Sequence, residues 1–196
     1  MPPVCLRCGQ RRESAGLCDS CQAVLPHYTA LRAWAYFDGP VRNAIHALKY
    51  KRDISLGEVL SRPMITCIQN QQWSIDVVVP VPLGSERLSQ RGYNQAALLA
   101  FPLALCLGLP YRPRALQKIR ETPSQVGLTM LERRTNVAGA FQARREDVLD
   151  QSILLVDDVT TSGATLDECA TAMLQAGAGQ VYGLTLARAI EIWRRV

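Results

Sequence analysis

Two adjacent carboxylates, Asp157 and Asp158, stand directly before a short loop of hydroxyl side chains within residues 153–165 of this 196-residue sequence. The carboxylates can accept hydrogen bonds from a vicinal diol, and the loop opens into a predicted helix whose first amides can hold a phosphate. Gly163 lets the backbone approach a ligand where a side chain would block it. Recognition of a diol beside a phosphate predicts a sugar phosphate as the ligand. The residues predicted to bind it are Asp157, Asp158, Thr160, Thr161, Ser162, Gly163, Ala164 and Thr165.

A strand–turn–helix with ordinary capping residues is the alternative interpretation of the same segment. It explains one Ser or Thr at the start of a helix. It does not explain two consecutive acids followed by a loop with four hydroxyl side chains. The ligand-binding interpretation is therefore favoured, because the strand–loop–helix context supports it.

Four cysteines near the N-terminus form the pattern C-x2-C-x9-C-x2-C. Each C-x2-C pair can turn two thiolates toward one ion, and four thiolates give tetrahedral zinc a closed structural site. Two disulfides are the first alternative, but they suit an oxidising compartment, and a redox C-x2-C would not explain two matched pairs. His27 is a weaker candidate for the same site. We predict structural Zn²⁺ held by Cys5, Cys8, Cys18 and Cys21.

Composition limits the class of protein. Hydrophobic residues make up 48% of the chain, which is enough for one sizeable core with a small appendage. The net charge is +5, and residues 112–146 contain eight Arg or Lys against three Asp or Glu, which suits phosphate-bearing ligands or nucleic acid.

No signal pattern opens the chain, and the apolar run 96–110 is shorter than the roughly 20 residues that span a bilayer. We expect a cytoplasmic protein without a transmembrane segment.

Strands that alternate with helices must position the acids and the hydroxyl loop. Such alternation predicts an α/β fold whose parallel sheet is flanked by helices and binds ligands at the carboxyl ends of its strands. Residues 84–92 are expected to form a polar loop, and residues 112–140 a flap or a short β excursion. Cys67, Cys106 and Cys169 are expected in the core. Predicted strands cover 31–37, 76–82, 153–156 and 181–188, and predicted helices cover 40–48, 56–68, a segment from about Asn94, and 166–175 up to Gly177.

Several short motifs occur in a fixed order along the chain. They are His46-Ala-Leu-Lys49-Tyr50, Val79-Pro-Val-Pro82, Arg91-Gly-Tyr-Asn-Gln95, the spaced polar residues from Leu116 to Asn136, and the 153–165 segment. The last resembles the phosphoribosyl-pyrophosphate (PRPP) motif of type I phosphoribosyltransferases. With the cysteine module in front, the whole chain resembles the ComF/GntX-like family of bacterial competence and DNA-utilisation proteins.

That resemblance implies a zinc-ribbon module over residues 1–28 on a type I phosphoribosyltransferase-like domain over residues 29–196. It implies PRPP as the ligand, with the two acids on the ribose hydroxyls and the loop on the 5-phosphate. The diphosphate of PRPP needs Mg²⁺ and basic groups. The candidates for the diphosphate or for a flap over it are Lys49, Arg87, Arg91, Lys118, Arg120 and Gln125.

The function implied by the resemblance is PRPP binding in natural transformation, with handling of incoming single-stranded DNA. The alternative is an active phosphoribosyltransferase of nucleotide or nucleobase metabolism; the sequence identifies neither catalytic residues nor an acceptor base. Expected partners are PRPP, single-stranded DNA and DNA-uptake or helicase machinery at the inner face of the membrane. DNA contact is expected from the zinc module, residues 112–146 and the aromatics Trp34, Tyr36 and Tyr93.

Overall fold

The computed structural model describes residues 3–123 and 127–189, so the flap candidate Gln125 lies outside the described residues. Four parallel strands form the central sheet in the order β1-β6-β5-β2, and β3 pairs with β4 as a separate antiparallel ribbon. The predicted parallel sheet is confirmed. The strands are β1 Ala30–Tyr36, β2 Val77–Pro80, β3 Leu116–Lys118, β4 Phe141–Ala143, β5 Ser152–Thr160 and β6 Gln180–Arg188.

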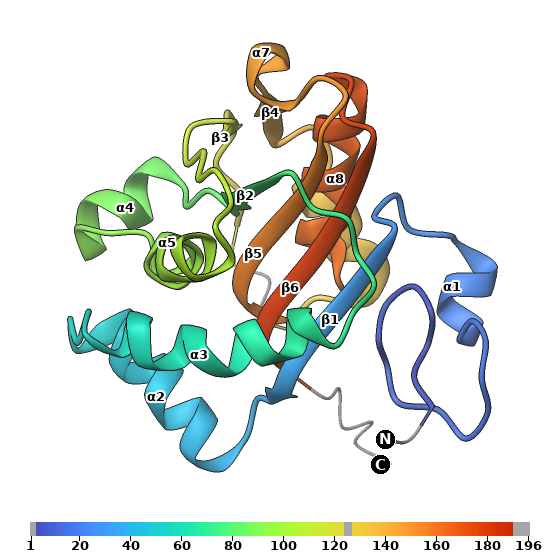
Figure 1. The fold of residues 1–196 in the computed structure, drawn as a ribbon, viewed down its shortest axis with the longest axis horizontal. Coiled ribbons are helices and arrows are strands. Elements are labelled where there is room, and N and C mark those ends of the chain that lie inside the picture. Colours follow the sequence, from blue (N-terminus) through green and yellow to red (C-terminus); the bar gives the residue numbers. More distant parts are fainter. Residues whose placement is uncertain (1–2, 124–126, 190–196) are drawn as a thin grey trace.

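Helices cover both faces of the sheet (Figure 1). On one face α5 packs against β2 and β5, and α3 packs against β1 and β6, while α8 packs on the other face beside α6 and β4. Within residues 3–123 and 127–189, every helix falls short of the length and apolar character that a membrane span requires. The helices are α1 Asp19–Ala23, α2 Gly39–Tyr50, α3 Leu56–Gln69, α4 Ser85–Arg91, α5 Gln95–Leu107, α6 Met130–Val137, α7 Arg145–Val148 and α8 Ala164–Gln175.

The apolar run that opens β5 is buried because both of its faces are covered. Ile153 and Leu155 belong to the core beneath α8, and Leu154 and Val156 belong to the core beneath α3 and α5. Side chains alternate between the two faces of a strand, so a strand between two layers needs a continuous apolar run. The same argument accounts for β6, whose residues from Val181 to Ala187 are buried.

Four sequence expectations need correction. The predicted polar loop 84–92 is the helix α4, which buries none of its residues and therefore carries no apolar stripe. The predicted flap or β excursion 112–140 contains β3, as expected, but also the helix α6. Strand β5 continues past the apolar run through both acids to Thr160, so the acids lie in the strand and not after it. Cys106 is exposed, whereas Cys169 is buried as predicted.

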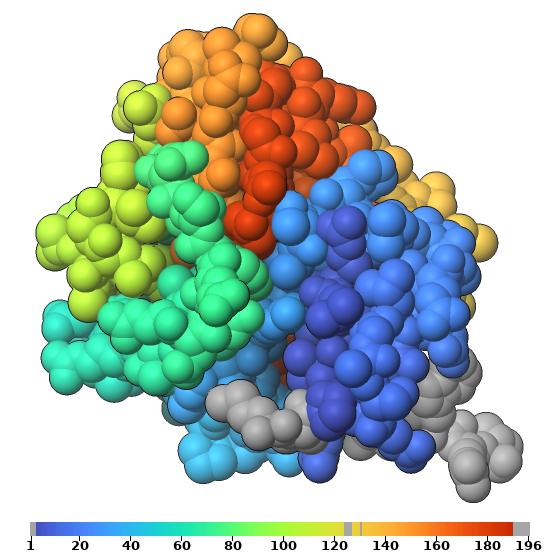
Figure 2. Space-filling model, turned by 45° about the vertical axis from the view of Figure 1, so that its right-hand side comes forward, coloured from blue at the N-terminus to red at the C-terminus, as the bar shows by residue number. Residues whose placement is uncertain are grey.

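The cysteine module is hydrogen-bonded to the start of the edge strand β1 and to the residues just before it. The Leu31 amide donates to the Arg7 carbonyl at 2.7 Å, and the Arg7 guanidinium donates to the carbonyls of Tyr28 and Thr29 at 3.0 Å. The four cysteines share one buried cluster with Tyr28 and Leu31. Figure 2 shows the dark-blue N-terminal segment lying against the lighter-blue residues that follow it. The module therefore contributes to the same core as the sheet.

Candidate functional site

A cavity of about 660 Å³ opens at the carboxyl ends of β2 and β5. Most of the residues predicted to bind the ligand line it, although they come from segments more than 100 residues apart. They are Lys49, Arg87, Arg91, Lys118, Asp157, Asp158, Thr160, Thr161, Gly163, Ala164 and Thr165. Two predicted residues, Ser162 and Arg120, are not part of this lining.

Strand pairing places the two acids at the mouth of the cavity. Asp157 lies opposite Thr185 of β6, and Thr160 lies opposite Arg188, so the strand holds both acids rigidly at its carboxyl end. Asp158 is only 3% exposed. A buried carboxylate needs a charged or hydrogen-bonding partner, because transfer of an isolated charge out of water is very costly.

Lys49 and Gln95 supply the partners of Asp158. The Lys49 ammonium forms an ion pair with Oδ2 of Asp158, and the Gln95 side-chain amide donates to Oδ1 at 3.2 Å. Gln95 in turn accepts a hydrogen bond from the Arg91 guanidinium, which lies 5.5 Å from the ring centroid of Tyr50. This relay holds two cations and one buried acid side by side on the cavity wall.

The ionisation of Asp157 is perturbed. Burial, and then the neighbouring Asp158 carboxylate, raise the pKa of Asp157 well above its usual range. Its Oδ1 accepts a hydrogen bond from the Asp158 amide at 2.8 Å. A ligand that donates hydrogen bonds or brings a cation to this carboxyl would offset the cost of its charge.

The hydroxyl loop turns sharply into α8. Gly163 stands in the left-handed region at φ +84°, and a Cβ there would lie 3.0 Å from the Tyr28 hydroxyl, so the position favours glycine on two counts. The helix α8 begins at the next residue, Ala164. Thr161 and Thr165 line the cavity on either side of this turn. The turn therefore presents amides and hydroxyls to the same space as the acids.

The opposite wall comes from α4 and from the segment that follows β3. The Lys118 side chain is only 8% exposed, and its burial lowers the pKa of the ammonium, which donates to the Thr122 hydroxyl at 2.9 Å. The Glu121 carboxylate accepts hydrogen bonds from the Ser85 hydroxyl at 2.9 Å and from the Glu86 amide at 3.3 Å. A Cβ on Gly84 would lie 2.2 Å from that carboxylate, so a side chain at this position would displace the end of the Glu121 side chain.

Arg120 and Ser162 occupy other places. The Arg120 guanidinium donates to the carbonyls of Asn136 and Ala138, at 3.1 and 2.6 Å, where it supports the end of α6. Ser162 lines a second cavity of about 310 Å³, which lies between the hydroxyl loop and the cysteine module. Sequence reasoning missed Gln95 and Tyr50 as site residues, although they lie in the Arg91–Gln95 and His46–Tyr50 motifs. No sequence signal identified the role of Glu121.

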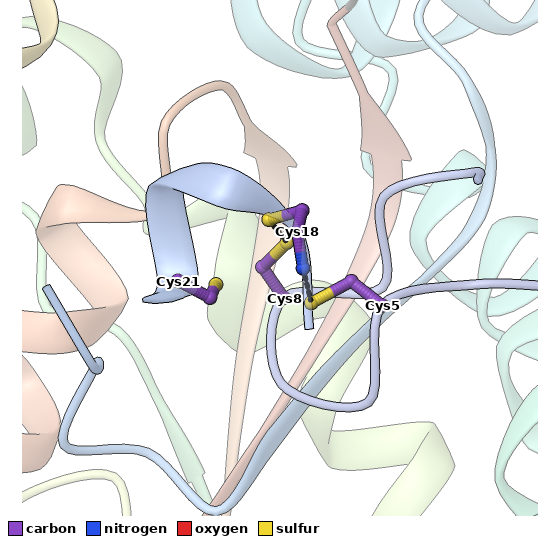
Figure 3. A group of neighbouring side chains, drawn as sticks. All are labelled: Cys5, Cys8, Cys18 and Cys21. Atoms are coloured by element: carbon purple, nitrogen blue, oxygen red, sulfur yellow. Dashed lines mark hydrogen bonds between the residues drawn. The ribbon is translucent and has the colours of Figure 1, made fainter. Parts of the chain in front are cut away.

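The four cysteines form a separate cluster (Figure 3). Cys5 and Cys8 come from one loop, and Cys18 and Cys21 come from the start of α1. Their Sγ atoms all lie within 4.8 Å of one another, and the four are free thiols. Tetrahedral zinc with Zn–S bonds of about 2.3 Å needs sulfur atoms roughly 3.8 Å apart, so the cluster fits a zinc ribbon and could hold such a metal.

Three of the clustered thiols, Cys5, Cys8 and Cys21, differ in their ionisation. Although burial raises the pKa of Cys5, hydrogen bonds from the amides of Cys18, Cys8 and Arg7 lower it to about 6. Burial raises the pKa of Cys8 to about 11 and that of Cys21 further. A bound divalent cation would remove these protons, since the thiolate is the ligand. His27 contacts Asp167 at 3.2 Å and is absent from the cluster of possible metal ligands among the described residues.

Comparison with known proteins gives relatives along nearly the whole chain. DNA utilization protein YhgH of Salmonella typhimurium is 30% identical over 193 residues, covering 95% of this chain and 85% of that protein. Competence protein F of Haemophilus influenzae is 27% identical with the same coverage. Competence protein ComFC of Bacillus subtilis is 36% identical over 113 residues, which are 57% of this chain and 44% of that one.

The fold is shared with a solved PRPP amidotransferase structure. The glutamine PRPP amidotransferase of B. subtilis, complexed with ADP and GMP, superimposes with a TM-score of 0.51 at 21% identity, over 73% of this chain and 30% of that one. Residues 58–194 match the family described as the phosphoribosyl transferase domain. The chain therefore belongs to the phosphoribosyl transferase domain family, within the ComF/GntX-like group that its ordered motifs resemble.

Proposed function

We propose that this protein binds PRPP together with Mg²⁺ in the 660 Å³ cavity and acts in natural transformation, on incoming single-stranded DNA. The observation that carries the proposal is the convergence of an acid pair, a hydroxyl loop and the predicted basic residues Lys49, Arg87, Arg91 and Lys118 around one cavity. The ribose hydroxyls would meet Asp157 and Asp158, and the 5-phosphate would meet the loop from Thr160 to Thr165. Backbone amides at the start of α8 would add to phosphate binding.

The basic residues around the cavity suit the diphosphate of PRPP. Lys49, Arg87, Arg91 and Lys118 surround the remaining space of the cavity, and Mg²⁺ binds phosphate oxygens with few protein ligands. Arg120, whose guanidinium supports α6, is the weakest of the predicted diphosphate contacts. We propose Zn²⁺ at the four cysteines as a structural ion, since four thiolates leave no open coordination position.

The biological setting rests on the relatives. Proteins named competence protein F and DNA utilization protein share most of this chain, and we propose that the same setting applies here. The proposed partners are single-stranded DNA and DNA-uptake or helicase machinery at the inner face of the membrane. The proposed division at residues 28 and 29 separates the zinc module from the domain that holds the cavity.

Isothermal titration calorimetry of the full chain with PRPP and Mg²⁺ tests the ligand proposal. We expect saturable binding at one site per chain that weakens when Mg²⁺ is omitted, because the ion screens the diphosphate. A ribose 5-phosphate titration should give weaker binding, since it lacks the diphosphate. If PRPP gave no heat beyond dilution at millimolar concentration, the ligand proposal would fail.

The candidate DNA surface lies beside the second cavity. Trp34 and Tyr36, two residues apart on β1, are 43% and 45% exposed and share one face of the strand. Tyr36 lines the 310 Å³ cavity with Arg11 and Arg134, so stacking and phosphate contacts are available together. Tyr93 donates its hydroxyl to the Leu48 carbonyl and is better explained by packing.

We expect the double variant Trp34→Ala and Tyr36→Ala to bind a fluorescent oligothymidine at least about 30-fold more weakly at fixed salt, because stacking contributes about 1–3 kcal/mol per base and two stacking side chains are lost. Fluorescence anisotropy at several salt concentrations measures this and separates stacking from phosphate charge. Phe101→Ala is the matched control, since Phe101 is 55% exposed on α5 and packs edge-on against Tyr111. Equal weakening in the control would argue against a stacking surface on β1.

A second candidate function is catalysis of phosphoribosyl transfer. The family match over residues 58–194 favours it, and the cavity of 660 Å³ lies within the range of small-molecule sites. Basic groups around the diphosphate would then stabilise its departure. Release of diphosphate from PRPP, measured with a panel of nucleobases, distinguishes an active enzyme from a binding protein.

A further inference from the structure

One arginine joins the cysteine module to the hydroxyl loop. Arg188, the last residue of β6, donates from Nη2 to the carbonyl of Cys8 and from Nη1 to the carbonyl of Thr161 at 3.4 Å. Cys8 is one of the clustered cysteines, and Thr161 lines the 660 Å³ cavity. A single guanidinium therefore contacts both sites at the same time.

Two further contacts reach the loop from the end of the module. The Tyr28 hydroxyl lies against Gly163, within 3.0 Å of where a Cβ would stand, and Tyr28 itself is 2% exposed. The His27 amide donates to Asp167 at 2.6 Å, in the first turn of α8. Residues on both sides of the loop are thus supported by the segment that begins with the cysteines.

The hydroxyl loop borders a cavity on each side. Thr161 lines both cavities, and Ser162 lines the 310 Å³ cavity behind the loop, which also opens onto Cys8 and Cys21. A loop with a cavity on each side is held by its contacts and not by close packing. The carbonyl of Cys8, in turn, is fixed by the turn that carries the Cys5–Cys8 pair, where the Gly9 amide donates to the Cys5 carbonyl at 3.0 Å.

We propose that Arg188 is a positioning residue that couples metal binding at the four cysteines to ligand binding at the hydroxyl loop. A bound metal fixes the turn at Cys8, Arg188 transmits this order to the Thr161 carbonyl, and the loop is held in its phosphate-binding form. The inference rests on the proposed binding of PRPP. Coupling between two sites is reciprocal, so PRPP strengthens zinc binding by the same factor by which zinc strengthens PRPP binding.

The test compares two arginines that both hold the cysteine module. Arg32, on β1, donates to the carbonyls of Leu6 at 3.3 Å and Leu31 at 2.9 Å, but makes no hydrogen bond to the hydroxyl loop. We expect Arg188→Gln to weaken PRPP binding about tenfold in calorimetry with Mg²⁺, and Arg32→Gln to leave it unchanged. Arg188→Lys, which keeps the charge but loses the double contact, should behave like Arg188→Gln. The zinc content of each protein is measured alongside.

The reciprocal measurement uses the unmodified protein. Zinc is titrated away with a chromogenic chelator at equilibrium, with and without saturating PRPP and Mg²⁺. We expect PRPP to raise the zinc affinity about tenfold in the unmodified chain and in Arg32→Gln, and to have no effect in Arg188→Lys. This experiment still decides the matter if Arg188→Gln fails to fold.

Two outcomes separate this inference from the proposed function. If PRPP binds the unmodified chain but leaves its zinc affinity unchanged, the coupling is refuted and PRPP binding stands. If PRPP fails to bind the zinc-loaded unmodified chain, both the proposed function and the coupling fall. Equal loss of PRPP affinity in Arg188→Gln and Arg32→Gln would also refute the role of Arg188, since it would reflect general loosening of the module.

Discussion

Replacement of both acids of β5, as Asp157→Asn and Asp158→Asn, should remove PRPP binding to the limit of detection. Each carboxylate would accept hydrogen bonds from a ribose hydroxyl, and hydrogen bonds to charged groups contribute about 1.5–3 kcal/mol each. Loss of two such bonds corresponds to a loss of affinity of more than about 100-fold. Calorimetry with PRPP and Mg²⁺ measures the change directly.

The control for this variant lies at the other end of the same strand. Asp150 is exposed and precedes β5. Its φ is +57°, a conformation that asparagine also tolerates. Asp150→Asn therefore removes a carboxylate charge, as the test substitutions do, but at a position away from the cavity. Asp150→Asn should bind PRPP normally. Thermal melting must accompany the double variant, because Asp158→Asn leaves the Lys49 ammonium without its ion-pair partner. If the double variant folds and binds PRPP with unchanged affinity, the two acids do not contact the ligand.

Local patterns in the sequence were sufficient for the parts of the site that are contiguous. The apolar run from Ile153, the acids and the hydroxyl loop predict a strand, a turn and a helix within 13 residues, and the structure contains them in that order. The paired cysteines likewise predict a cluster, because C-x2-C spacing itself brings two thiols together. The structure confirms this cluster.

Contacts between distant segments could not be predicted in the same way. Gln95 contacts Asp158 across 63 positions, and Glu121 reaches the start of α4 across 36 and 35 positions. Nothing in the local sequence singles out Glu121, and the Arg91–Gln95 motif does not by itself place Gln95 beside Asp158. The helix α4 escaped prediction for a related reason: a helix that buries no residue has no periodic apolar face. The helix α6 did carry a signal, the capping box of Thr129 and Glu132.

Loss of two cysteines should have the largest effect on stability. In the variant Cys5→Ser and Cys21→Ser, one ligand is lost from each C-x2-C pair, so neither pair can hold the metal with two thiolates. Structural zinc contributes about 10–16 kcal/mol in isolated zinc-finger peptides, comparable to the whole stability of a typical domain. We expect no bound zinc in this variant by elemental analysis, against one ion per chain in the unmodified protein.

The melting temperature of the same variant should fall by about 10 °C or more, because roughly 1 kcal/mol shifts it by 2–4 °C in a chain of this size. The effect should reach the sheet, since the cysteines share their buried cluster with Tyr28, Leu31 and Leu166. Cys106→Ser is the matched control, as Cys106 is exposed on α5 and lies apart from the cluster. A chelator should reproduce the fall in the unmodified chain and leave the double variant unchanged. Equal melting temperatures for the zinc-free and zinc-loaded proteins would show that the cysteines pack as ordinary core residues and that the metal has no structural role.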